Sequence, residues 1–351
     1  MANAGDEIVL EDLDKNGVES VTLDASSSYG PIASYEWSEN NVVLSQEQTA
    51  NVELSSGIHN IKLLIRDEFG NESEDFVKVD VREILWEENF NEFNTDVWEA
   101  EIGDGCDQGL CGWGNDELQS YKQENVYIDA IPGETNNNAL VIEAKVENDN
   151  QSAFTSARVK SQDQLTLKYG LVETRIKVPD DLSTGLWPAF WLLGNNISEV
   201  GWPRSGEIDM MEMGYKQQSL RDEGFENVTE NEVVGGNIIF YSDEACTGEN
   251  PDCAASISFD KYYSKPYRSS SNTLTDRFLT YRMYWDPNEI KLTVVDNGQE
   301  FEFYTGPFPL GADAEEFHLP FFFVINLAVG CLLYTSPSPR DMRRSRMPSS
   351  A

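Results

Sequence analysis

From Ile84 to Gly330 the sequence alternates short runs of β-forming residues with turns, and almost nothing recurs at helical period. Strands are predicted most clearly at Leu140–Ala144, Leu171–Val178, Tyr281–Trp285 and Ile290–Val295. The tripeptide Asp296-Asn297-Gly298 that follows is a hairpin signal, because Asn and Gly tolerate a positive φ. About 250 residues of short strands in one block predict a jelly-roll sandwich, with a substrate groove on its concave face.

Residues 1–82 form a separate block, which we interpret as a small β-sandwich. Short strands are predicted at Val18–Leu23, Ile32–Trp37, Ile58–Ile65 and Phe76–Val81. Trp37 has the place of a buried core aromatic. The block resembles the polycystic-kidney-disease (PKD) domain, an immunoglobulin-like module, in Leu23–Ser28, Ser34–Trp37 and Arg66–Gly70. A related immunoglobulin-like module is the alternative.

The run Gly206–Glu212 carries three carboxylates, Glu207, Asp209 and Glu212, inside an apolar stretch. In a regular strand Glu207 and Asp209 share a face, and Glu212, five positions after Glu207, points to the other. One extra residue, a β-bulge near Met210-Met211, brings all three to one face. Two carboxyl groups held across a sugar can break a glycosidic bond. We therefore expect a bulged strand that carries a catalytic acid pair.

The spacing of the three acids is weak evidence by itself. Acidic residues occupy 62 of 351 positions, so three at these offsets arise by chance roughly twice in such a chain. A second copy occurs at Glu99–Asp104, where Gly103 and Gly105 break any strand, and we interpret it as a solvated turn. Ile and Met residues separate the acids of the copy at 207–212, which makes that copy the candidate.

The formal charge is −37 and the isoelectric point is near 4.2, which argues against nucleic acid or an anionic membrane surface as a partner. A secreted protein in a salty medium and a soluble surface without a charged partner both fit this charge. No run of 18 apolar residues exists, so no transmembrane helix is expected. Residues 1–7 lack a basic n-region and an apolar h-region, so no signal peptide is expected. Either the protein is cytosolic or its true N-terminus is missing.

Four of the five cysteines form two close pairs in Gly- and Asp-rich loops, Cys106/Cys111 and Cys246/Cys253. A zinc site would need histidines or Cys-x-x-Cys spacing, and the chain has only two histidines. We expect two short disulfide-closed loops and an oxidising compartment.

The last 21 residues differ in character from the rest of the chain. Residues 1–330 carry 61 acidic and 21 basic side chains, a net charge of −40, whereas residues 331–351 carry four Arg and one Asp, a net charge of +3. The change falls directly after the apolar run Phe321–Gly330. We interpret residues 331–351 as a non-native tail of the kind that a translated frameshift leaves.

Tryptophans gather around the acidic strand. Trp187 and Trp191 lie four positions apart in Gly185–Leu193, so on a strand they share one face, while Phe190 and Leu192 share the other. One face would then be core and the other lined with indoles, whose flat faces suit the C–H-rich faces of a neutral sugar. The alternative for each tryptophan is the sandwich core.

Three ordered blocks, Gly112–Gln119, Gly185–Leu193 and Gly206–Glu212, resemble the signature blocks of glycoside hydrolase family 16. Within it they most resemble the bacterial laminarinases, which are endo-acting β-1,3-glucanases. The resemblance covers roughly residues 84–330. It implies an immunoglobulin-like sandwich at 1–82 followed by a concanavalin-like jelly-roll catalytic domain at 83–330, which is incomplete at its C-terminal end.

The resemblance also implies roles for individual residues. Glu207 is the nucleophile, Glu212 the general acid/base and Asp209 the residue that tunes the nucleophile. Closely spaced carboxyls favour the retaining, covalent route. They also raise one pKa, and Glu212, flanked by two Met residues, is the better candidate for the protonated form. The sugar-binding candidates are Asn115, Trp113, Trp187, Trp191, Trp202 and Arg204. For Arg204 a structural ion pair, and for Trp113 and Trp202 a place over the core, are the alternatives.

Two departures from the family pattern matter. Ile239 stands where many laminarinases carry a histidine, which removes one polar sugar contact. The final strand, which follows the position of Gly330, is replaced by the tail. No cofactor is required, but many members bind a structural calcium. Glu88 and Gly133 match its ligands from the first half of the domain, and the acid of the final strand is absent.

We therefore expect a secreted, monomeric, retaining endo-β-1,3-glucanase that acts on a neutral β-glucan of the laminarin type, without nucleic-acid binding or membrane insertion. Another family 16 glycanase, of the agarase, carrageenase or lichenase type, is the alternative enzyme. A non-catalytic glucan-binding protein on the same fold is the alternative from another class. Loss of the acidic pair would mark it, and both glutamates are present here.

Overall fold

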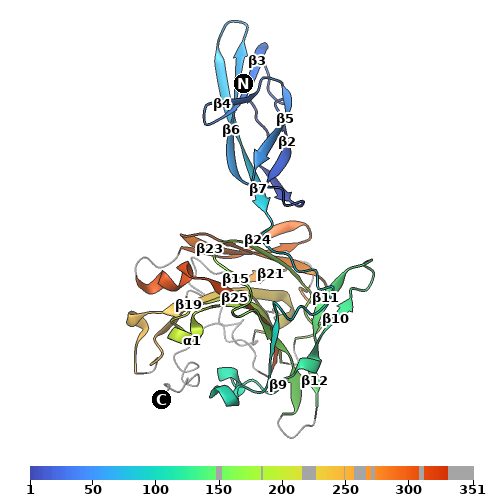
Figure 1. The fold of residues 1–351 in the computed structure, drawn as a ribbon, viewed down its shortest axis with the longest axis vertical. Helices are drawn as coiled ribbons and strands as arrows, with labels where there is room; N and C mark the ends of the chain where they lie inside the picture. Colours follow the sequence, from blue (N-terminus) through green and yellow to red (C-terminus); the bar gives the residue numbers. More distant parts are fainter. Residues whose placement is uncertain are drawn as a thin grey trace. The chain divides into compact units, whose positions relative to one another are not determined.

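The computed structural model describes residues 1–147, 152–182, 185–215, 227–248, 250–256, 266–269, 273–307 and 312–330. The tail at 331–351 lies outside these residues. The chain forms two compact units, Met1–Glu88 and Asn89–Ala351. Both consist mainly of β-strands, so the all-β prediction is confirmed (Figure 1).

The first unit contains seven strands: β1 (Ile8–Asp12), β2 (Val18–Asp24), β3 (Ile32–Glu39), β4 (Val42–Ser45), β5 (Thr49–Ser55), β6 (Gly57–Asp67) and β7 (Glu72–Glu83). One sheet has the order β1-β7-β6-β3-β4, and β2 pairs with β5 in a second. Alternate side chains of these strands form one core, which includes the fully buried Trp37. The indole N–H of Trp37 donates to the Glu47 carbonyl at 3.1 Å. The four predicted strands and the buried aromatic are confirmed.

The strands of the second unit are β8 (Glu99–Glu101), β9 (Gln119–Tyr121), β10 (Val126–Ala130), β11 (Asn138–Ile142), β12 (Lys145–Val146), β13 (Phe154–Ser156), β14 (Arg158–Lys160), β15 (Thr166–Leu167), β16 (Gly170–Ile176), β17 (Leu186–Gly194), β18 (Glu207–Glu212), β19 (Val233–Tyr241), β20 (Ala254–Ser256), β21 (Tyr267–Arg268), β22 (Leu279–Trp285), β23 (Glu289–Asp296), β24 (Gln299–Pro307) and β25 (Phe321–Val329). Among the described residues of this unit, the helical elements are one turn of α-helix, α1 (Ile197–Val200), and the 3-10 segments η1 (Cys106–Gln108), η2 (Cys111–Gly114), η3 (Gln123–Asn125), η4 (Glu230–Glu232), η5 (Asp243–Ala245) and η6 (Ala312–His318).

Two sheets face each other in this unit. The larger has the order β20-β19-β18-β17-β25-β14-β8, with β15 beside β25 and β21 beside β19, and the smaller has the order β16-β22-β23-β24. Figure 1 shows β23 and β24 in one layer and β19 and β25 in the next. Shorter sheets, β10-β11 and β12-β13-β9, accompany them.

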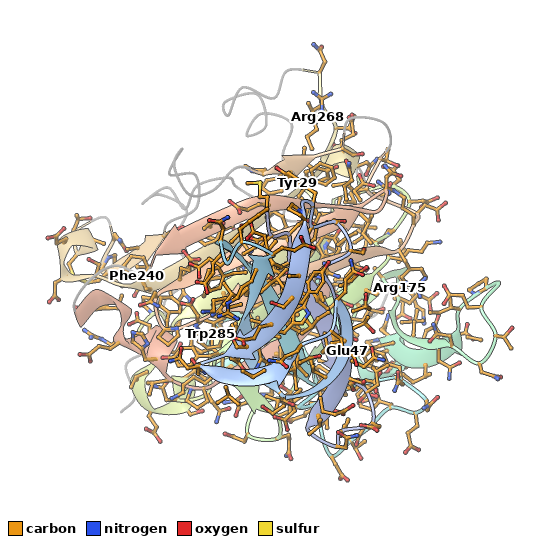
Figure 2. The ribbon with its side chains drawn as sticks, turned by 90° about the horizontal axis from the view of Figure 1, so that it is seen from above. Tyr29, Glu47, Arg175, Phe240, Arg268 and Trp285 are labelled. Atoms are coloured by element: carbon orange, nitrogen blue, oxygen red, sulfur yellow. A yellow bond between two sulfur atoms is a disulfide. The ribbon has the colours of Figure 1, made fainter. Side chains whose placement is uncertain are left out.

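The core lies between these two sheets. Phe190, Leu192, Ile208 and Ile238 of the larger sheet belong to one buried cluster with Tyr281, Met283, Leu292 and Val294 of the smaller. Figure 2 labels two further members, Phe240 of β19 and Trp285 of β22. The β23–β24 hairpin closes at Asn297 and Gly298, which have φ of 51° and 76°, as the turn signal predicted. Each sheet therefore packs one face into this core. The opposite face of the larger sheet does not pack against the smaller sheet and can carry the site.

Candidate active site

The acidic strand β18 is bulged. Its register with β17 pairs Phe190 with Met211 and Trp191 with Asp209, so Met210 has no partner. On the other side, β19 advances two residues while β18 advances three, from Asp209 to Glu212. The predicted bulge is therefore confirmed, in the segment where it was expected.

The bulge places the three carboxylates on one face. Cross-strand partners share a face of a sheet, and on β17 the acids Glu207, Asp209 and Glu212 pair with Leu193, Trp191 and Ala189. Ile208 and Met211 pair with Leu192 and Phe190, which lie in the core. We call the side that carries the three acids the outer face of the larger sheet. The predicted division of β17 into a core face and an indole face is confirmed.

The nucleophile candidate Glu207 has polar neighbours. The indole N–H of Trp202 donates to its Oε2 at 2.6 Å, and Asp209 donates to it as well. Burial raises the pKa of Glu207, and these two donors and the charge of Arg158 oppose that rise. The pKa of Asp209 is raised well above its ordinary value by burial and by the charges of Glu212 and Glu207. These surroundings favour the protonated form of Asp209, which donates a hydrogen bond to Glu207.

Glu212 has different surroundings. Burial and, to a smaller extent, the charge of Glu207 raise the pKa of Glu212 to about 8. The indole N–H of Trp187 donates to Oε1 of Glu212 at 3.3 Å, and this hydrogen bond opposes the rise. A carboxyl with this pKa holds its proton near neutral pH and can give it to a leaving oxygen. The arrangement thus offers a hydrogen-bonded carboxylate and a protonated carboxyl on one face, which acid-assisted glycoside cleavage requires.

The tryptophans take several places around the acids. Trp187 and Trp191 are half-buried on the outer face. Trp202 is also half-buried and contacts Glu207 directly. Trp113 is only 7% exposed and packs against Tyr121 with ring centroids 5.5 Å apart.

The remaining sugar-binding candidates are exposed. Asn115 lies after η2, and its Nδ2 donates to Glu117 at 3.2 Å. Arg204 stacks on the ring of Tyr241 with its guanidinium carbon 3.4 Å from the ring centroid. Ile239, the departure from the laminarinase pattern, pairs with Glu207 and so shares its face.

Two residues of the outer face were missed at the sequence level. The guanidinium of Arg158 lies between two indoles, 4.8 Å from the centroid of Trp113 and 4.8 Å from that of Trp191. Asn326 pairs with Arg158 across β14 and β25, and its Oδ1 accepts the indole N–H of Trp191 at 2.7 Å. The one available signal was the alternation of Arg158, Val159 and Lys160, which predicts a polar face on a short strand.

The interpretation of Glu99–Asp104 as a solvated turn was wrong at its start. Glu99–Glu101 forms β8, which pairs with β14 at the edge of the larger sheet. Glu101 forms an ion pair with Arg158 at 2.6 Å. The strand conformation of this segment depends on pairing with a strand more than 50 positions away rather than on local propensity.

Both predicted disulfides are present, Cys106–Cys111 and Cys246–Cys253. In the described ranges, three acidic side chains come close enough to share a metal ion at Asp12, Asp14 and Glu19, and Glu88 is not in that group. The calcium site that the resemblance implied at Glu88 and Gly133 stays a prediction. In the part of the chain that the structure describes, no helix is long and apolar enough to span a membrane.

Comparison with known proteins places this site in a family. Residues 115–223 match the model of the XgeA-like, catalytic GH16 domain. The clotting factor G alpha subunit of Tachypleus tridentatus is 31% identical over 248 residues, which are 71% of this chain and 30% of that protein. A glucan endo-1,3-beta-glucosidase of Cryptopygus antarcticus is 30% identical over 256 residues, which are 70% of this chain and 79% of that protein. The chain thus spans about a third of the length of the clotting factor subunit.

Solved structures agree with these relatives. The laminarinase from Flavobacterium sp. UMI-01 superposes with a TM-score of 0.52 at 31% identity, over 73% of this chain and 91% of that one. The GH16 protein of the mixed linkage glucan PUL of Bacteroides ovatus, in complex with a G4G4G3G product, superposes with a TM-score of 0.54 at 28% identity, over 75% of this chain and 92% of that one.

Proposed function

The chain belongs to glycoside hydrolase family 16, and from this premise we propose that it is a retaining endo-glycoside hydrolase that cleaves β-1,3-glucan of the laminarin type. The observation that carries the proposal is the bulge in β18, which places Glu207, Asp209 and Glu212 on one face. Relatives named as an endo-1,3-beta-glucosidase and a laminarinase support the substrate.

The two steps follow from the surroundings of each acid. In the first, a Glu207 oxygen bonds to the anomeric carbon, the bond from that carbon to the leaving glucosyl oxygen breaks, and Glu212 gives its proton to that oxygen. In the second, Glu212 takes a proton from water, the water oxygen bonds to the anomeric carbon, and the bond to Glu207 breaks. Asp209 and Trp202 donate to Glu207 and so stabilise it as the carboxylate that leaves.

The sugar chain is held by aromatic and polar side chains of the same face. Trp187 and Trp191 offer half-buried indoles beside the acids, and Trp202 lies at Glu207. Asn115 and Arg204 add exposed polar groups. Trp113 is buried and contacts Arg158, whose guanidinium in turn contacts the ring of Trp191.

The proposal also covers the accessory module, the location, the partner and the oligomeric state of the protein. Residues 1–82 serve as a PKD-like accessory module, and they lie in the separate compact unit Met1–Glu88, which has its own core. Two disulfides support a secreted or cell-surface location. A neutral β-glucan is the partner, the working form is a monomer, and a structural calcium at Glu88 and Gly133 is part of the proposal without a role in either step.

The alternative enzyme is a mixed-linkage (lichenase-type) glucanase, which the product complex of the Bacteroides ovatus relative favours. The protein is therefore incubated with laminarin, agarose and mixed-linkage glucan while reducing ends are followed. Laminarin cleavage is expected to dominate and to be lost in Glu207→Gln. Absence of cleavage of every β-glucan would contradict the substrate, and full activity of the variant would contradict the site.

Two further measurements decide mechanism and class. Anomeric NMR of early products is expected to show retained configuration, and inverted products would exclude the covalent route. Laminarin binding without any release of reducing ends would favour the non-catalytic glucan-binding alternative.

A further inference from the structure

Glu117 is a half-buried acid that the mechanism does not use. Glu117, in the block Gly112–Gln119, accepts three hydrogen bonds: from Asn115 Nδ2 at 3.2 Å, from Gln119 Nε2 at 2.6 Å and from the Tyr121 hydroxyl at 3.1 Å. Three donors on one carboxyl group suit an ionised carboxylate, which is an acceptor only. Glu117 thus connects Asn115, an exposed sugar-binding candidate, to the buried residues Gln119 and Tyr121 of β9.

The two β9 residues that donate to Glu117 each form a hydrogen bond with β25. The Oε1 of Gln119 accepts the backbone N–H of Val329 at 2.7 Å. The hydroxyl of Tyr121 accepts from Nδ2 of Asn326 at 3.3 Å, and Oδ1 of the same amide accepts from Trp191. A continuous chain of hydrogen bonds therefore runs from Glu117 through Tyr121 and Asn326 to the indole of Trp191.

That indole lies next to the catalytic strand. Trp191 pairs directly with Asp209 on β18, and its ring lies against the guanidinium of Arg158. Arg158 also acts electrostatically on Glu117 and on Glu207, and it forms an ion pair with Glu101. An amide such as Asn326 can present either end to the indole, and the hydroxyl of Tyr121 selects the end that accepts.

We propose that Glu117 is a positioning residue: its carboxylate orients Asn115 directly and Trp191 through Tyr121 and Asn326, and so it sets the sugar-binding geometry beside the acid pair. The inference rests on the proposed function, because the two oriented side chains matter only if the outer face binds a glucan. Glu117 itself contacts no reacting atom in this scheme.

The charge of Glu117 gives a second, independent consequence. The cation that acts on Glu117 is Arg158 on β14, which forms an ion pair with Glu101 on β8, and Tyr121 is the titratable group on β9. Burial raises its pKa and Arg158 opposes that rise. Arg158 acts on both Glu117 and Glu207, and the potentials of the two charges add, so removal of the negative charge of Glu117 leaves a more positive potential around Arg158 and lowers the pKa of Glu207.

The test compares Glu117→Gln with Glu124→Gln, which removes the same charge at an exposed position of η3. Gln keeps one acceptor oxygen and turns an amino group toward the donors. For Glu117→Gln we expect the KM for laminarin to rise about tenfold, which corresponds to about 1.4 kcal/mol, with kcat changed less than about threefold. The acid limb of kcat/KM should move to lower pH. Glu124→Gln should match the wild type in both.

A second variant and a binding measurement separate the possible failures. Glu117→Asp keeps the charge but is shorter, so it should raise KM without moving the acid limb. If Glu117→Gln does not fold, Tyr121→Phe, which removes only the linking hydroxyl, should raise KM in the same sense. Tryptophan fluorescence measures laminarin affinity in the Glu207→Gln background, with and without Glu117→Gln. This comparison tests the positioning of the sugar-binding side chains in the absence of turnover.

The outcomes are distinct. A wild type that binds laminarin without cleaving it contradicts the proposed hydrolysis and leaves the fluorescence comparison to decide the positioning. An unchanged affinity in that comparison, or equal effects of Glu117→Gln and Glu124→Gln on KM, overturns the positioning role. A wild type that neither binds nor cleaves a β-glucan overturns both.

Discussion

Replacement of Glu212 by Gln removes the proton that the proposed first step needs. With a pKa of about 8, the Glu212 carboxyl is about 0.9 protonated at pH 7, whereas a carboxyl with a pKa of 4.5 is about 0.003 protonated. Burial and the charge of Glu207 thus raise the population of the working acid about 300-fold. Gln keeps the shape but has no proton to give.

The kinetic assay uses two leaving groups. On laminarin, Glu212→Gln should lower kcat by about 10²–10⁴-fold, the usual contribution of a general acid. On a dinitrophenyl β-glucan oligosaccharide, whose phenolate leaves without a proton, the burst of the first step should stay within about tenfold of the wild type. The activity of the wild type on laminarin should fall as pH rises through about 8, and the burst of the variant should lack this limb.

Stability gives an independent reading of the same pKa. Between pH 4.5 and about 8 the folded state keeps a proton on Glu212 that the unfolded state releases, so the free energy of unfolding of the wild type falls as pH rises. The fall amounts to at most about 5 kcal/mol at 1.36 kcal/mol per pKa unit. Glu212→Gln should lack this fall in the free energy of unfolding. In thermal melts, its stability relative to the wild type should therefore increase toward pH 9. Parallel stability curves for the two proteins, or a basic limb retained in the burst of the variant, would refute the reasoning.

Three further outcomes are expected. Gly235→Ala would place a Cβ 1.8 Å from the Tyr215 hydroxyl, so thermal melts should show a loss of about 1–3 kcal/mol together with a loss of laminarin activity. Trp191→Phe removes the indole N–H bonded across to β25, so it should raise KM several-fold and lower the stability in thermal melts by about 1–3 kcal/mol, because the buried Asn326 oxygen loses this donor. The double variant Cys246→Ala/Cys253→Ala opens a short loop and should cost about 2–3 kcal/mol of stability by denaturant titration, and reductant should destabilise the wild type further, because it also opens Cys106–Cys111.

Strand periodicity and turn chemistry predicted most of the elements, because their signal is local. The alternation in Tyr281–Trp285 and the Asn297-Gly298 turn needed no knowledge of partners. The bulge was also predictable, since three acids within an apolar run at spacings of two and three fit one face in no regular strand.

The missed features share a different physical origin. Asn326 bonds to Trp191 across 135 positions and to Tyr121 across 205. Arg158 is held between two indoles that come from other segments. No local pattern encodes such contacts, because they arise only when β14, β25 and the 112–119 block meet in the folded sheet.

The bulge also explains how two glutamates five positions apart lie on one face in different surroundings. Before the bulge, Glu207 lies among donors and near the cation of Arg158. After it, Glu212 pairs with Gly235, whose missing side chain leaves room for the Tyr215 hydroxyl. Tyr215 belongs to an apolar cluster that also contains Trp187, Val228 and Val233. A regular strand would turn Glu212 into the core, so the extra residue is what moves the second acid onto the outer face and into an environment that keeps its proton.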